Sequence, residues 1–139
     1  MKHSSVCIVL CLATGSGCSK PTPIELSNAC DLRNEKKYVR VGGFLDDDGS
    51  VFCSNIGGRM HCDFVLNETS GGAKKMDVQL DQGIAANSVE KPESGYGRRD
   101  IKIHDNNGRV INLEDKVSLT GRMSVAKDVC FITVDKIEN

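Results

Sequence analysis

Two long segments near the end of the chain alternate between apolar and other residues. Residues 116–125 place Val117, Leu119 and Met123 on one face, because successive side chains of a β-strand point to opposite sides. Residues 129–137 alternate in the same way. A strand that buries one face and exposes the other needs a sheet with a single core. The pattern therefore predicts that the chain ends in two half-buried strands.

Shorter segments upstream have the same texture. Strands are predicted over residues 38–45, 51–53, 61–66 and 76–80. Turns are predicted over 46–50 and 56–59, and a hairpin over 101–112, with Asn107-Gly108 as its turn.

The remaining segments are less regular. Residues 28–37 favour one or two short helical turns, and a short helix over 84–89 is the only other helical candidate. The chain has 139 residues, enough for one core. The prediction is an all-β fold, a small barrel of five to six strands with at most one or two short helices.

The N-terminus has the pattern of an export signal. An apolar stretch over residues 6–13 follows Lys2 and is too short to span a bilayer. Small residues precede Cys18, which resembles the lipobox of bacterial lipoproteins. Gly15 departs from the aliphatic residue that is usual in that motif. The resemblance implies a signal peptide over residues 1–17 and a lipid on Cys18; an ordinary secretory signal is the alternative.

That resemblance also implies a location. Acyl chains on Cys18 would anchor the protein in the bacterial envelope, and Ser19 resembles the default for an outer-membrane protein that faces the periplasm. Residues 18–28 are expected to form the lipidated N-terminus and an extended tether, because Pro21 and Pro23 disfavour regular hydrogen bonding. The barrel domain is then expected over residues 29–139.

Four of the seven cysteines would remain once Cys18 is acylated and the signal is removed: Cys30, Cys53, Cys62 and Cys130. An even number in an oxidising compartment predicts two disulfides. Three pairings exist, and spacing favours Cys53–Cys62 and Cys30–Cys130. A metal site is the alternative, with His61 as a further ligand, but no CxxC pair occurs.

Three of the predicted strands resemble strands of an OB-fold. Residues 39–45 are similar to its first strand, which bends around glycine; residues 113–122 are similar to its fourth and residues 129–137 to its fifth. Anticodon-binding-like domains and periplasmic bacterial OB-fold proteins are the kin this implies. Such domains bind ligands on strands two and three, although a fold does not transfer a function.

Catalytic and metal-binding motifs do not emerge. The acidic run 46–50 lacks the Glu that ends an EF-hand loop, and 105–108 fails the same comparison. His61 and His104 have no nucleophile or carboxylate in a catalytic spacing, so strand or surface positions are expected. The sequence predicts a protein that is not an enzyme and uses no cofactor.

Two basic pairs are the candidate ligand-binding residues. Lys74 and Lys75 begin a strand near the usual OB-fold binding face, and Arg98 and Arg99 lie in the long loop. Together they could bind an anionic partner such as a glycan or a phosphate-rich lipid. The alternative is scattered charge that keeps the protein soluble.

The function expected from the sequence is a membrane-anchored, non-enzymatic binding or structural module with an envelope protein or glycan as partner. Two alternatives stay open: a small barrel that inhibits an envelope-directed enzyme such as lysozyme, and a domain that binds oligonucleotides or oligosaccharides. A net charge of −1 and the absence of Trp disfavour a nucleic acid. The sequence leaves the oligomeric state open.

Overall fold

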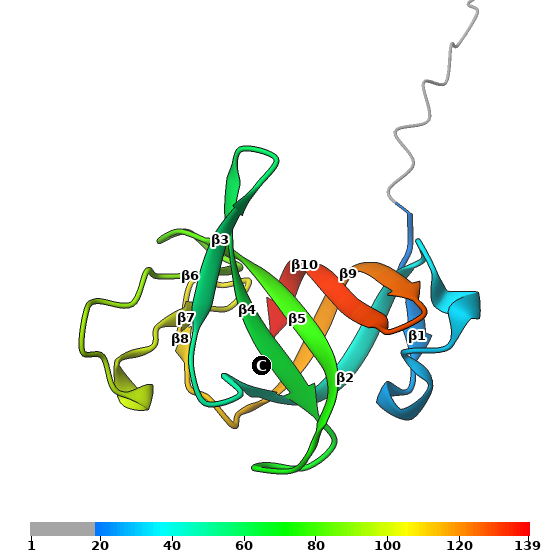
Figure 1. The fold of residues 1–139 in the computed structure, drawn as a ribbon, viewed down its shortest axis with the longest axis horizontal. Helices are drawn as coiled ribbons and strands as arrows, with labels where there is room; N and C mark the ends of the chain where they lie inside the picture. The colour runs from blue at the N-terminus through cyan, green and yellow to red at the C-terminus, as the bar shows by residue number, and fades with distance from the viewer. Residues whose placement is uncertain (1–18) are drawn as a thin grey trace, which may run out of the picture.

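Five long strands form a closed barrel in a computed structural model that describes residues 19–139 (Figure 1). The barrel strands are β2 (Tyr38–Asp46), β4 (Arg59–Asn67), β5 (Lys74–Gln82), β9 (Lys116–Ala126) and β10 (Val129–Glu138). Around the barrel, β2 pairs with β4, β4 with β5, β5 with β10, β10 with β9, and β9 with β2. All of these pairs are antiparallel except β5–β10. The predicted OB-like barrel is confirmed.

Alternation along the strands determines what the barrel encloses. On β5 the buried side chains are Met76, Val78 and Leu80, while the residues between them face outward. The other barrel strands add the remaining core residues, among them Val39, Val41, Leu45, Phe64, Leu66, Leu119, Met123, Ile132 and Ile137. Burial of these side chains supplies the main driving force for folding.

Two glycines let the strands approach closely inside the barrel. A Cβ on Gly43 would lie 2.7 Å from the side chain of Leu66, and a Cβ on Gly121 would lie 2.1 Å from the carbonyl oxygen of Thr133. Around Gly43, β2 changes from pairing with β9 to pairing with β4. The bend expected in the first barrel strand therefore lies at a glycine because a side chain there would collide with β4.

Shorter elements surround the barrel. The short strands are β1 (Thr22–Ile24), β3 (Phe52–Ile56), β6 (Ser88–Val89), β7 (Ile103–His104) and β8 (Val110–Ile111). Single 3-10 turns are η1 (Leu26–Asn28), η2 (Leu32–Asn34) and η3 (Arg98–Asp100). The predicted hairpin over 101–112 is confirmed as β7 and β8, with Gly108 at a φ of 76° in the turn.

Two expectations about local structure were wrong. The helix over 84–89 is absent: Ile84 is 84% exposed, so no apolar face is available to dock a helix, and Ser88–Val89 form β6 instead. Part of the predicted tether is ordered, because β1 pairs in parallel with β2. Pro23 is tolerated there because β1 pairs with β2 alone among the described strands.

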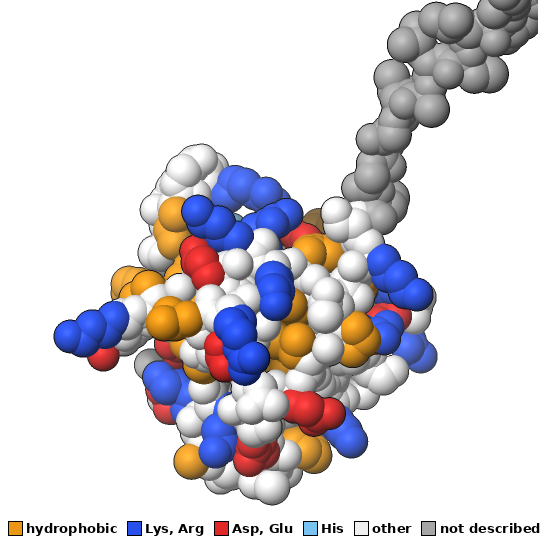
Figure 2. Space-filling view, turned by 90° about the vertical axis from the view of Figure 1, so that its right-hand side faces the viewer, with side chains coloured by type: hydrophobic (Ala, Val, Ile, Leu, Met, Phe, Trp, Pro, Cys, Tyr) orange, Lys and Arg blue, Asp and Glu red, His pale blue; other side chains and the backbone are white. Residues whose placement is uncertain are grey.

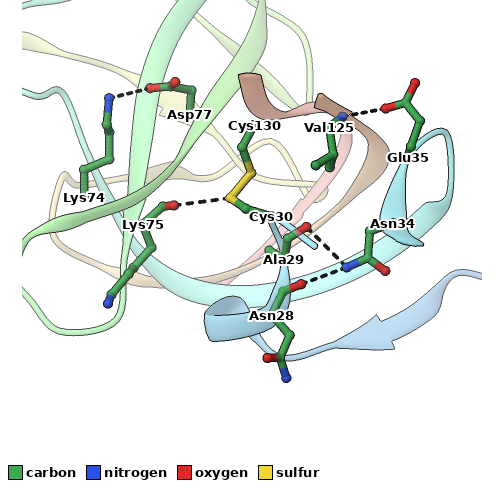
Figure 3. The surroundings of a disulfide bond; sticks show 10 residues. All are labelled: Asn28, Ala29, Cys30, Asn34, Glu35, Lys74, Lys75, Asp77, Val125 and Cys130. Carbon is green, nitrogen blue, oxygen red and sulfur yellow. Dashed lines mark hydrogen bonds and ion pairs between the residues drawn. A yellow bond between two sulfur atoms is a disulfide. The ribbon is translucent and has the colours of Figure 1, made fainter. Parts of the chain in front are cut away.

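Both predicted disulfides are present. Cys30 and Cys130 join the start of the domain to the last strand, and Cys53 and Cys62 join β3 to β4. Around the first disulfide, the Asn34 side chain donates to the carbonyls of Asn28 and Ala29 (2.9 and 3.2 Å) (Figure 3). These hydrogen bonds hold the segment after β1 together, and the Cys30–Cys130 disulfide attaches it to β10 of the barrel.

Residues 1–17, predicted as an export signal, and Cys18, predicted as the lipid attachment site, lie outside the described residues. Within residues 19–139, no helix is both long enough and apolar enough to cross a bilayer.

Candidate ligand-binding face

The two predicted basic pairs make contacts within the molecule. The Lys74 ammonium lies 3.2 Å from Asp77, and that of Lys75 lies 3.7 Å from Glu68. Both pairs are partly exposed, and exposed ion pairs contribute little to stability. These ion pairs still neutralise the charges of Lys74 and Lys75 locally. Neither lysine is therefore an unpaired cation that an anionic ligand could bind.

Arg98 is held by three carboxylates. Its guanidinium lies 2.9 Å from Asp46, 2.7 Å from Asp47 and 3.4 Å from Glu114. Partial burial lowers the pKa of Arg98, but the three acids outweigh this and raise it above its ordinary value. Asp47 is only 2% exposed, so Arg98 fastens the long loop to the end of β2.

Arg99 has a different environment from Arg98. It makes no ion pair with any residue from 19 to 139, and it lines a polar surface hollow of about 470 Å³ together with Tyr96 and Lys102. Acids also line that hollow, including Glu90 and Asp100. The anion-binding patch stays a prediction, because Arg99 is the only one of its four residues that forms no ion pair within residues 19–139.

Charges of both signs are mixed on the side of the barrel that carries β1 (Figure 2). Blue and red side chains alternate there with apolar ones, and no large field of one sign forms. Interspersed charge of this kind is typical of a solubilising surface.

A second surface lies on β3, β4 and β5, which correspond to the region of the usual OB-fold binding face. Register places Phe52 beside Asp63 and Gln79, and Ser54 beside His61 and Asp81. The residues between them on β4 and β5 point into the core, so these side chains point outward. We call this surface the outer face; its residues are Phe52, Ser54, Ile56, Arg59, His61, Asp63, Asp77, Gln79 and Asp81.

Two of the three carboxylates on the outer face have cationic neighbours. Asp81 is paired with Arg59 and lies 3.1 Å from Nδ1 of His61. Asp77 has Lys74. The histidine that sequence reasoning placed on a strand is thus part of this surface, whereas His104 lies in β7, 3.0 Å from Glu90.

Asp63 differs from the other two. Its carboxylate makes no hydrogen bond or ion pair with any residue from 19 to 139. Partial burial raises the pKa of its carboxyl, Asp77 raises it further, and His61 lowers it in part. The ionised form of Asp63 therefore has no ion-pair partner among the described residues, although it lies at the centre of the face.

Apolar side chains flank that carboxylate. Phe52 is 66% exposed and is the register neighbour of Asp63, and Ile56 is 50% exposed further along β3. Both belong to the hairpin of β3 and β4, which extends beyond the barrel in Figure 1. Aromatic side chains are enriched at protein interfaces.

The hairpin that carries these residues is stiff. Gly57 and Gly58 both have positive φ (61° and 84°), as the tight turn between twisted strands requires. The Cys53–Cys62 disulfide crosses the two strands, with Cα atoms 4.0 Å apart. Preorganisation of this kind lowers the entropy lost on binding.

Sequence reasoning missed Phe52 and Asp63. The period-two alternation of residues 52, 54 and 56 would have indicated one face of a strand, but the predicted strand ended at Cys53. The predicted turn at 56–59 fixes the register that brings Phe52 beside Asp63. Within residues 19–139, no group of three or more His, Cys, Asp or Glu side chains is placed to hold a metal ion.

Comparisons with known protein families, with curated proteins and with solved structures found no match. The fold itself defines a class: a closed OB-like barrel with two disulfides and an acidic, partly apolar face on β3, β4 and β5.

Proposed function

We propose that this chain is a lipid-anchored binding module of the bacterial envelope, without enzymatic activity, that binds a protein partner on its outer face. The observation that carries the proposal is the unpaired carboxylate of Asp63 beside the exposed ring of Phe52. Anchor and location rest on the export signal and on Cys18.

The chemistry of the face favours a basic partner. An arginine or lysine of the partner would supply the counter-charge that Asp63 lacks, and its aliphatic stem or guanidinium would pack on Phe52. A polyanion would instead meet Asp63 and Asp77, which disfavours the oligonucleotide alternative. Since the pKa of Asp63 is raised, acidification removes this attraction at a higher pH than for an ordinary aspartate.

Inhibition of an envelope-directed enzyme is a second candidate. It is favoured by the stiff hairpin, which presents Phe52 and Ile56 at a projecting edge of the molecule. Lysozyme is a suitable probe because it is a basic protein that acts on the envelope.

Site-specific photocrosslinking in the envelope tests the proposal. A photoreactive amino acid at Gln79, which lies beside Asp63 in the register, should capture one predominant partner. Asp63→Asn and Phe52→Ala should each reduce the crosslink about tenfold, as expected when a charged or central contact is lost.

Matched controls are available elsewhere on the surface. Asp48→Asn changes the same charge in the exposed turn after β2, and Val110→Ala trims a side chain that is 53% exposed on β8. A crosslink that responds equally to all four variants would rule out the outer face. Addition of the oxidised chain to a lysozyme lysis assay separates the two candidates: unchanged lysis eliminates inhibition of lysozyme and leaves the binding proposal standing.

A further inference from the structure

One edge of the sheet is open along β3. This strand pairs with β4 on one side, and no described strand pairs with it on the other. An open edge presents unpaired backbone donors and acceptors, which is the feature through which another chain can extend a sheet.

The geometry of the hairpin shows which backbone groups face the open edge. The Cα atoms of Cys53 and Cys62 lie 4.0 Å apart, the short spacing of a pair that does not exchange backbone hydrogen bonds. The N–H and C=O groups of Cys53, and of Asn55 two residues further on, therefore point away from β4. Neither residue's backbone forms a hydrogen bond with another element within residues 19–139.

Along β3 itself the edge lacks the usual protection against pairing, and the nearest cover is at Val51, just before the strand, whose N–H donates to the Tyr96 hydroxyl (2.8 Å). The five residues of β3 carry no charge and no proline, whereas β1, which pairs only with β2, contains Pro23. Natural proteins place lysine, proline or a bulge on edges that must stay free. An uncharged, partly apolar edge is suited to pairing.

We infer that β3 pairs antiparallel with β3 of a second copy of this chain, about a two-fold axis at Ser54. In this register Cys53 lies opposite Asn55 of the second copy, and the two exchange both backbone hydrogen bonds. The symmetric pair adds two more. Every outward-pointing group of Cys53 and Asn55 is then satisfied.

The side chains fit the same register. Phe52 lies opposite Ile56 of the second copy, in a pair of the closer kind, and the symmetric pair repeats this on the other side of the axis. Moving the register by two residues in either direction would leave Phe52 opposite Ser54 or Gly58. The central register is thus the one that pairs both exposed apolar side chains.

Charges on the adjacent strand are complementary in this arrangement. Asp63 neighbours Phe52 and Arg59 neighbours Ile56. Across the dimer the side chains follow in the order Asp63, Phe52, and then Ile56 and Arg59 of the second copy. An acid of one copy is therefore at one end of this row and a base of the other copy is at its other end. The two-fold axis makes the interface self-complementary, as an isologous dimer requires.

The dimer would join two outer faces into one continuous surface. The dimer rests on the backbone edge of β3 and on Phe52 and Ile56, whereas partner binding rests on Asp63 and Phe52. Variants at Asp63 and Ser54, which each touch one of the two, therefore separate dimer formation from partner binding. Asp63→Asn should weaken partner binding and leave the dimer intact, and Ser54→Lys should break the dimer.

Analytical ultracentrifugation of the oxidised full chain, in a density-matched detergent, tests the inference. We expect a reversible dimer whose dissociation constant rises about tenfold or more in Ser54→Lys, because two like charges would then face each other at the axis. Ser70→Lys, the same change in an exposed loop, should leave the dimer unchanged. A monomer at every concentration, or equal weakening by both variants, would overturn the inference.

A second variant covers the case in which Ser54→Lys disturbs folding. Ser54→Cys places two thiols across the axis at a spacing suited to a disulfide. Oxidation should give a covalent dimer through residue 54, with Cys53–Cys62 intact by peptide mapping. Ser70→Cys is the control. If both cysteine variants crosslink equally, or neither does, the pairing of β3 is wrong.

Discussion

The buried carboxylate of Asp47 holds the long loop in place through its contact with Arg98. It is 2% exposed, accepts from the backbone N–H of Gly49 at 3.1 Å, and meets Arg98 at 2.7 Å. A buried carboxylate is costly unless it is hydrogen-bonded and paired. Arg98 therefore acts on stability through the long loop that it fastens, even though its own side chain is half exposed.

Arg98→Ala should lower the free energy of unfolding by about 1–3 kcal/mol, because it leaves the Asp47 carboxylate without its cation. Arg99→Ala is the matched control, since Arg99 makes no ion pair with residues 19–139, and it should change stability by less than about 0.5 kcal/mol. Urea unfolding of the three proteins measures both effects. Equal destabilisation by the two variants would show that Arg98 is not the fastening residue.

Strands β9 and β10 illustrate how a close approach is built into a pair of elements. Thr133 lies on β10, next to Gly121 of β9, and its carbonyl oxygen occupies the space a side chain at 121 would need. The contact is with backbone and not with a movable side-chain tip, so neither strand can yield without a shift in the ladder.

Gly121→Ala should destabilise the barrel by about 1–3 kcal/mol or more, as overpacking does. Gly42→Ala tests whether the loss is specific to that position. A Cβ on Gly42 would have its nearest neighbour at 3.7 Å, an ordinary contact, so a change within about 0.5 kcal/mol is expected. Thermal unfolding compares the two, and a tolerated alanine at 121 would mean that the ladder adjusts.

At the level of elements, local pattern predicted most of the fold. The last two strands were predicted to within one residue at each end, because one face of each is buried and the alternation is clear. The prediction for β3 was too short. Phe52 and Ile56 at its two ends are apolar but exposed, so alternation of apolar residues alone does not assign them to a strand that faces the core. β1 was missed because two prolines disfavour a strand in general but not at an edge.

The candidate site was harder to predict, because it depends on contacts between distant segments. Arg98 and Asp47 are 51 positions apart, and no local pattern pairs them. Lys74 and Lys75 were chosen for their charge. Asp77, which pairs with Lys74, is only three residues away, but the contact of Lys75 with Glu68 is visible only once β4 and β5 are paired. The disulfides were predicted because four cysteines allow only three pairings.

On the scale of the whole molecule, two disulfides and the closed barrel make one unit, from Cys30 to the end of β10 at Glu138. The first disulfide closes a loop with a sequence separation of 100, for which the chain-entropy relation gives about 4–5 kcal/mol. The second stiffens the hairpin that presents the outer face. Both need an oxidising compartment, in agreement with the proposed envelope location.

Intact mass of the protein from membrane fractions tests that location. We expect a chain that begins at Cys18 and carries acyl groups, and a gain of about four protons on reduction, two for each disulfide. An unacylated mass would remove the anchor from the proposal, and free thiols would remove the oxidising compartment. Neither result would alter the barrel.

The crosslink between Cys30 and Cys130 has a mechanical consequence for a domain pulled by its N-terminus. Tension would first strip β1 from β2, a separation of three residue pairs. The load would then pass at Cys30 through the disulfide into Cys130 on β10, bypassing the rest of the barrel. The segment before Cys30 would extend under tension, while the surface on β3, β4 and β5 kept its shape.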